Sequence, residues 1–214
     1  MLKFIETLKN IWTIDELKNR ILITLFFLVI YRLAAQVVLP GVDYNIISDA
    51  QIAGGGGLLG LLNAFTGGAF ANASVVALGI MPYISASIVV QLMGVALPYL
   101  QKLQKEGESG RKKITQITRW LTIGICVVQA PAYLYGLGAL GVPDSAFVLG
   151  KGPFFIIPSV IILVTGCIFA MWLGEKITDR GIGNGISLLI TVGIIASLPL
   201  SFTQEVISQL SGSG

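Results

Sequence analysis

Long apolar runs separated by short polar segments dominate the pattern of this chain. A helix needs about 20 apolar residues to cross the hydrocarbon of a bilayer. Five windows reach that length, at about residues 21–39, 73–97, 119–140, 153–173 and 185–204. They lack the two-residue alternation of membrane β-strands. The pattern therefore predicts an all-α fold, a polytopic membrane helical bundle of five transmembrane helices spread over residues 21–204.

Composition and the distribution of charge support this prediction and give it an orientation. Hydrophobic residues make up 54% of the 214 residues and charged residues only 12%. Lys and Arg gather before the first window, between the second and third, and after the fourth, which are on one side if the spans alternate. Because cytoplasmic loops carry the excess of Lys and Arg, we expect a cytoplasmic N-terminus and an extracytoplasmic end at residues 205–214.

The first 20 residues have a mixed composition that differs from a cleavable signal peptide. Apolar residues recur there at nearly helical spacing, at Leu2, Ile5, Leu8, Trp12 and Leu17. This spacing favours a cytoplasmic amphipathic N-terminal segment at residues 1–20 that lies on the membrane surface. A solvated charged tail is the alternative.

A short apolar segment, GGGGLLGLLNAFTGG at residues 54–68, lies between the first two windows. Its central LLGLLNAF can form about two helical turns, which span roughly 12 Å and cannot cross a bilayer. Backbone at membrane depth is tolerated only where protein buries it or where it lines a watery cavity. The segment therefore either enters such a cavity from the outer side or forms an interfacial cap, and sequence physics leaves both open.

The second window carries a proline and a stripe of isoleucines. Pro82 is expected to kink the helix. Ile80, Ile84 and Ile88 lie at i, i+4 and i+8, and Ile186 and Ile190 form a similar pair in the fifth window. Such stripes usually pack against neighbours or lipid, but two that face each other across a passage can seal it by dewetting.

Two polar residues inside the apolar windows require partners. Arg32 lies near the middle of the first window and must find a carbonyl, a carboxylate or water inside the bundle. Gln129 in the third window, where Pro131 is expected to interrupt the helix, is expected to hydrogen-bond to a neighbouring helix. The loop at residues 100–120 is predicted to be an exposed hairpin, which either docks a partner or only fixes the topology.

Candidate chemistry is scarce, and the sequence predicts no catalytic residue, metal site or cofactor. The chain has no histidine, and Cys126 and Cys167 are isolated residues typical of a core. The GIGNG segment at 181–185 lacks the strand and lysine of a nucleotide site. It instead predicts a tight turn into a helix, with Asn184 as a cap or in an unusual backbone conformation. The net charge of +3 follows from the cytoplasmic loops, so we expect no direct nucleic-acid partner.

Taken in order, six strings resemble the N-terminal half of the SecY family, the central channel subunits of the bacterial protein translocase. They are DELKNRILITL with VIYRLA, PGVD, GLLNAFTGGA, ALGIMPYISASIVVQLM, KEGESGRKKITQITRW and MWLGEKITDRGIGNGISLL. The resemblance extends from about residue 15 to 200. It implies one half of a pseudosymmetric ten-helix channel, with five of the ten spans.

The resemblance also implies roles for individual residues. The short helix at about 58–71 corresponds to the family's re-entrant plug, with the glycines as hinges. The isoleucine stripes correspond to its pore ring, although Ile186 is near the cytoplasmic end by simple counting. Asn72 stands where arginine is common. The implied sites are the plug residues Leu58, Leu59, Leu61, Leu62, Asn63 and Phe65, the pore ring Ile80, Ile84, Ile186 and Ile190, the lateral gate Ser85 and Gln129, and the partner loop Arg111, Lys112 and Lys113.

The function implied is that of a channel, not an enzyme. It would conduct unfolded secretory proteins across the bacterial plasma membrane, where a signal sequence opens the channel, and release membrane segments laterally into the bilayer. The implied partners are SecE, SecG, SecA or the ribosome, and YidC. Two alternatives stay open on the residues alone, half of a small-solute secondary transporter and an inert membrane scaffold.

Overall fold

A computed structural model describes residues 14–43, 46, 63, 66–140, 142–148, 150 and 152–210. Regular structure in this part of the chain is helical, and the β-pairing there amounts to two isolated bridges, Val38 with Ser74 and Val42 with Phe147. The predicted all-α fold is therefore confirmed. The N-terminal segment before residue 14 and the end after residue 210 lie outside the described residues.

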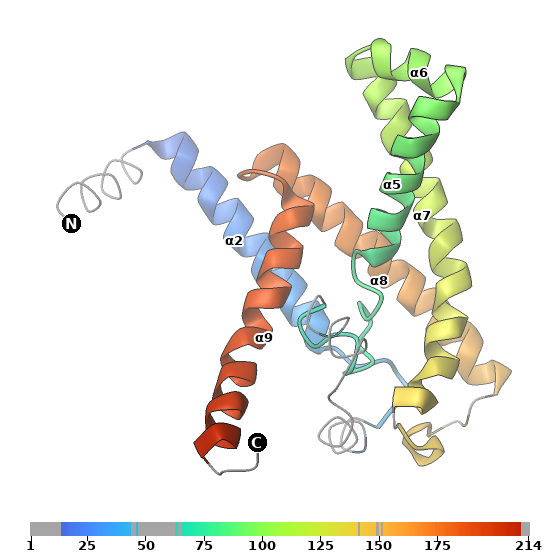
Figure 1. Ribbon diagram of the computed structural model, residues 1–214, viewed down its shortest axis with the longest axis vertical. Helices are drawn as coiled ribbons and strands as arrows, with labels where there is room; N and C mark the ends of the chain where they lie inside the picture. Colours follow the sequence, from blue (N-terminus) through green and yellow to red (C-terminus); the bar gives the residue numbers. More distant parts are fainter. Residues whose placement is uncertain are drawn as a thin grey trace.

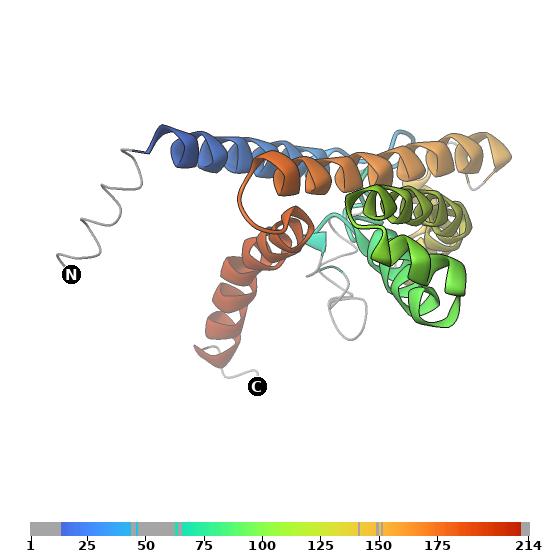
Figure 2. The same cartoon turned by 90° about the horizontal axis from the view of Figure 1, so that it is seen from above.

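The helices form two groups that meet where α7 packs on α8 (Figure 1). In one group α2 packs on α8 and α9, and in the other α5 and α6 pack on α7. Seen from above, α2 and α8 run side by side, while α9 diverges from them (Figure 2). The bounds are α2 Asp15–Gln36, α5 Met81–Ala96, α6 Pro98–Lys105, α7 Glu108–Gly136, α8 Pro153–Arg180 and α9 Gly185–Leu210, with short 3-10 turns η1 Leu137–Leu140 and η2 Asp144–Ala146.

Helix α2 has one face toward the bundle and one away from it. Asp15 and Glu16 begin the helix, where acidic side chains favourably meet the N-terminal end of the helix dipole. Thr24, Tyr31 and Ala35 are buried against the other helices. The outward face carries exposed apolar side chains at helical spacing, namely Leu22, Leu25, Phe26, Val29 and Leu33. This face suits contact with lipid or with further protein.

The second apolar window is helical only from Met81 onward, although the sequence suggested a span from about residue 73. The backbone before it turns repeatedly, with positive φ at Gly67, Gly68, Ala73 and Gly79. Pro82 lies in the first turn of α5, where its missing N–H is not needed. The expected kink at Pro82 is therefore wrong, because this proline begins a helix rather than bending one.

The chain bends by 100° between α5 and α6. Leu97 is extended, as expected for a residue that precedes a proline. Gly107, with φ of +71°, then turns the chain into α7. The loop predicted at 100–120 is a hairpin, as expected, but it is built from α6 and the first turns of α7 (Figure 1).

Two further helices run longer than their apolar windows. Helix α7 continues through Pro131, so the interruption expected there is wrong. Helix α8 extends beyond the expected end at residue 173 to Arg180.

Asn184 then caps α9, because its Oδ1 accepts hydrogen bonds from the N–H groups of Ile186 at 3.1 Å and Ser187 at 3.3 Å. The predicted turn and cap are confirmed.

Among the described residues, α7 and α8 are each long and apolar enough to cross a membrane, and α5 with α6 would add a third span if the bent pair is one crossing. The expected spans 21–39 and 185–204 correspond to α2 and α9. Their placement across a membrane stays a prediction.

Candidate functional site

A cavity of about 210 Å³ lies where α2, α5 and α9 converge on the turns that precede α5. Its lining is mostly apolar and consists of Tyr31, Thr66, Ile80, Met81, Ile84 and Ile190. Ile80 is buried, and Ile84 packs against the same apolar cluster of α2, α8 and α9. The two isoleucine stripes noted in the sequence therefore meet at one cavity.

Three of the four predicted pore residues, Ile80, Ile84 and Ile190, line this cavity. The fourth, Ile186, packs against the same apolar cluster but lines a different hollow of about 730 Å³. That second hollow is polar and includes Arg111, Arg119 and Glu175. Ile88, the third member of the α5 stripe, is 51% exposed and does not line the cavity.

Most of the predicted plug lies outside the described residues, namely Leu58, Leu59, Leu61, Leu62 and Phe65. Asn63 is described, and it organises the chain that follows. Its Oδ1 accepts a hydrogen bond from the Ala71 N–H at 3.0 Å, and its carbonyl accepts one from the Gly68 N–H at 2.9 Å. Thr66 Oγ1 accepts a further bond from the Phe70 N–H at 3.1 Å. These bonds hold Asn63 and the described residues 66–71 together as a compact turn.

Arg32 contacts this turn, which confirms the expectation that it finds a partner inside the bundle. Its Nη1 donates a hydrogen bond to the Gly67 carbonyl at 2.5 Å. Gly67 has φ of +63°, and a Cβ there would lie 2.6 Å from that nitrogen and 2.9 Å from the Cα of Gly193 on α9. Gly67 is thus enclosed between α2 and α9 with no room for a side chain.

The predicted gate residues, Ser85 on α5 and Gln129 on α7, are both exposed. Ser85 Oγ donates to the Met81 carbonyl one turn earlier at 3.2 Å. Gln129 lines a second apolar cavity of about 220 Å³ with Met81 and Tyr133. The structure thus places both side chains on open surface of the α5–α7 pair.

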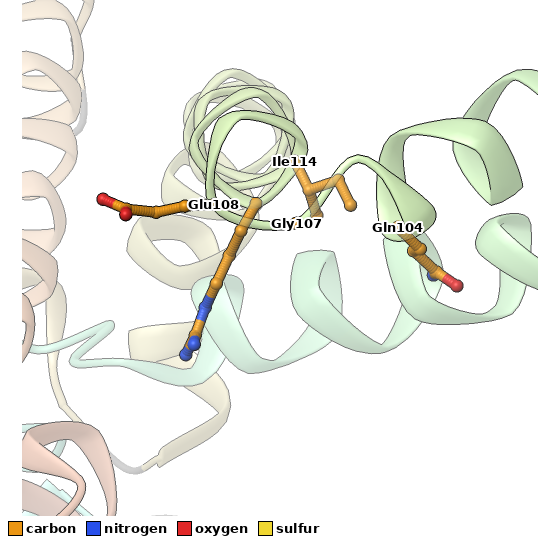
Figure 3. A pocket seen from close by; sticks show the side chains of 5 residues that line it. Gln104, Gly107, Glu108 and Ile114 are labelled. Carbon is orange, nitrogen blue, oxygen red and sulfur yellow. The ribbon is translucent and has the colours of Figure 1, made fainter.

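The predicted partner loop lies at the α6–α7 hairpin. Lys112 pairs with Glu108 at 3.1 Å and Lys113 with Glu106 at 3.6 Å. Arg111 lines both the polar hollow near Ile186 and a separate hollow of about 480 Å³ between α6 and α7. Figure 3 shows the labelled residues of this separate hollow, Gln104 from α6 and Gly107, Glu108 and Ile114 from the turn and the start of α7.

Sequence reasoning missed several residues that shape the site. Tyr31 and Thr66 line the isoleucine cavity. Tyr133 of α7 donates its hydroxyl to the Phe70 carbonyl at 2.6 Å, and its ring packs edge-to-face on Phe70. Tyr133 itself is nearly fully buried, and a buried tyrosine usually needs a hydrogen-bond partner, but the sequence alone did not indicate that the partner would be this carbonyl. In the described part of the chain no group of three or more Cys, Asp or Glu is placed to hold a metal ion.

An ion pair joins α7 to α8 beside the polar hollow. Arg119 Nε donates to Glu175 Oε1 at 3.0 Å, and its Nη2 contacts Oε2 of the same carboxylate. The pair is bidentate, but 44% of the Arg119 side chain is exposed, so water screens it.

We expect a double-mutant cycle of Arg119→Ala and Glu175→Ala to give a coupling free energy of about 1 kcal/mol, because the pair is bidentate, and we expect this coupling to decrease as salt is raised. The thermal midpoint of unfolding in detergent at two salt concentrations measures it. The matched control is the exposed pair Lys112–Glu108, for which about 0.3–0.5 kcal/mol is typical. A coupling as small in the first cycle as in the control would contradict the role of the bidentate geometry.

Comparison with known proteins shows which family this chain resembles. The SecY family model matches residues 74–213. Protein translocase subunit SecY of Haemophilus influenzae is 44% identical over 191 residues, and that of Escherichia coli K12 is 44% identical over 187 residues. These matches cover 89% and 87% of this chain but 43% and 42% of the relatives, so the chain spans less than half of their length.

Two solved structures have a similar fold at 19% sequence identity. One is described as the structure of a protein conducting channel, with a TM-score of 0.64, and the other as Sec61 in the canine ribosome–channel complex from the endoplasmic reticulum, with a TM-score of 0.60. Each match covers 91% of this chain and 42% of the other. From the family match and these relatives we conclude that the chain belongs to the SecY family.

Proposed function

We propose that this chain forms one half of a protein-conducting channel, which passes unfolded secretory proteins across the bacterial plasma membrane and releases membrane segments laterally into it. The observation that carries the proposal is the cavity where isoleucines of α5 and α9 meet beside Thr66. The curated relatives named protein translocase subunit SecY support it. Such a function involves no covalent chemistry by this chain.

Within this proposal Ile80, Ile84 and Ile190 form part of an apolar seal, with Ile186 toward the cytoplasmic side. The segment at 58–71 acts as the plug, and its exit is the turn at Gly67. Ser85 and Gln129 lie on the lateral gate, and their exposure suits a seam that further helices cover. A dry apolar constriction blocks ions yet yields to a polypeptide that brings its own side chains.

The exposed hairpin of α6 and α7 is the proposed contact for cytoplasmic partners, SecA or the ribosome, through Arg111, Lys112 and Lys113. Cytoplasmic loops carry the excess of Lys and Arg, so the basic hairpin is expected on the cytoplasmic side. We therefore place the N-terminus in the cytoplasm too, on the same side of the membrane as the hairpin. SecE and SecG are the proposed membrane partners, with YidC as a further one. The driving energy comes from such partners or from the proton gradient.

Site-specific photocrosslinking from Ile84, while a secretory precursor is stalled in transit in cells, tests the proposed function. We expect an adduct between Ile84 and the precursor. A probe at Phe26, which is 62% exposed on the outward face of α2, serves as the control and should give none. If export runs with the rest of the channel present and Ile84 still gives no adduct, the pore assignment is wrong and a scaffold function replaces it.

A further inference from the structure

The turn at Gly67 is attached to the surrounding helices by side chains whose positions the proposed function does not use. Arg32 reaches it from α2, and Tyr133 reaches the nearby Phe70 carbonyl from α7. Arg32 is half-buried in an otherwise apolar stretch of α2. An arginine at the centre of a membrane helix is unfavourable unless it finds a polar partner. An arginine in this position therefore calls for a specific interaction.

The interaction that Arg32 makes is well suited to holding a backbone turn. A charged donor to a carbonyl gives a stronger hydrogen bond than a neutral one. The accepting residue, Gly67, has a left-handed conformation and lies against Gly193 of α9. The turn is therefore contacted from two sides, by the Arg32 guanidinium and by the α9 backbone.

The consequence for the cavity follows from the position of Thr66. It is the residue before Gly67, it is 4% exposed, and it lines both the isoleucine cavity and the neighbouring cavity near Gln129. Any movement of the Gly67 turn away from α2 and α9 moves Thr66 out of both walls. The hydrogen bond from Arg32 to Gly67 is therefore one of the contacts that hold this part of the cavity wall.

We propose that Arg32 is a positioning residue, which holds the exit of the plug segment against α2 and α9 and keeps Thr66 in the cavity wall. The inference rests on the proposed function, because only in a channel does the Arg32–Gly67 contact, here called the latch, hold a closed state. The contact itself stands on the geometry of Arg32, Gly67 and Gly193 alone.

Thiol labelling tests the latch without relying on transport. Thr66→Cys is introduced into the intact protein in its native membrane, and its reaction rate with a small hydrophilic maleimide is measured with and without Arg32→Gln. Both native cysteines are fully buried, and the parent without Thr66→Cys gives the background rate. We expect Arg32→Gln to raise the rate about tenfold, the effect of losing one charged hydrogen bond that favours the closed position.

Two further variants make the result decisive. Arg20→Gln removes a positive charge from the same helix at an exposed pair with Glu16 and should leave the rate unchanged. Arg32→Lys keeps the positive charge on a shorter side chain and should raise the labelling rate less than Arg32→Gln does. If the Arg32→Gln protein does not accumulate, Arg32→Lys is used for the test instead. Equal rates with and without the Arg32 substitution, or the same rise for Arg20→Gln, overturn the inference.

The two proposals fail in different experiments. If Ile84 crosslinks to the stalled precursor but Thr66→Cys labelling ignores Arg32, only the latch is wrong. If labelling responds to Arg32 but Ile84 never meets a precursor, the latch stands as a feature of the fold and the channel assignment fails.

Discussion

Gly166→Ala is expected to destabilise the protein by about 1–3 kcal/mol, which is the usual range for overpacking a well-packed site. Gly166 lies on α8, and a Cβ there would collide with the Val75 carbonyl oxygen and lie 2.8 Å from its carbon. These are backbone atoms, and the Val75 N–H is bonded to the Val37 carbonyl at 2.9 Å. The Val75 backbone therefore cannot move away from α8 without disturbing the segment that leads to Ile80.

The matched control is Gly124→Ala on α7, where a Cβ meets no atom within 4 Å. Both substitutions add the same methyl group inside a helix, where alanine is favoured over glycine by about 1 kcal/mol. Gly124→Ala should therefore leave the thermal midpoint unchanged or raise it, while Gly166→Ala lowers it by about 2–4 °C per kcal/mol. Equal midpoints for the two variants would show that α8 does not approach Val75 this closely.

The positions of the helices could largely be predicted from the sequence, because apolar length and charge distribution act locally. The glycine-rich turn with its Asn184 cap and the need of Arg32 for a partner were predictable for the same reason. The irregular stretch before α5 was not. Its apolar residues resemble a span, but Ala73 and Gly79 have positive φ, which a helix does not allow, and the Ala73 carbonyl accepts a hydrogen bond from the distant Leu39 N–H.

Only part of the candidate site could be predicted from the sequence. The i, i+4 spacing marked both isoleucine pairs, but spacing cannot say how far along α9 the cavity lies, and so Ile186 was grouped with Ile190 although it lines another hollow. Thr66 and Tyr133 act through the folding of a turn onto distant helices. The sequence near Tyr133 does not indicate that its hydroxyl will donate to the Phe70 carbonyl of that turn.

The largest expected functional effect comes from placing a polar side chain in the isoleucine cavity. The cavity of about 210 Å³ is large enough to hold several waters. Its mostly apolar lining disfavours filling, and in the proposed channel a dry constriction here would exclude ions. An asparagine at position 84 adds an amide with two donors and an acceptor, which can hold the first waters and so favour a continuous wet path.

If the proposed channel function holds, Ile84→Asn is expected to raise the ion conductance of the resting channel, reconstituted in vesicles with its other half, about tenfold or more, because removing 1.4 kcal/mol from a dewetting barrier already accounts for that factor. Ile88→Asn is the control, since Ile88 is on the same helix one turn further, is 51% exposed and does not line the cavity. Conductance should stay at the parent level there. An equal rise for both variants would mean that the leak follows from a damaged α5, and no rise for Ile84→Asn would mean that this cavity is not the seal. Only a rise confined to position 84 places the ion barrier at the isoleucines rather than along the whole helix.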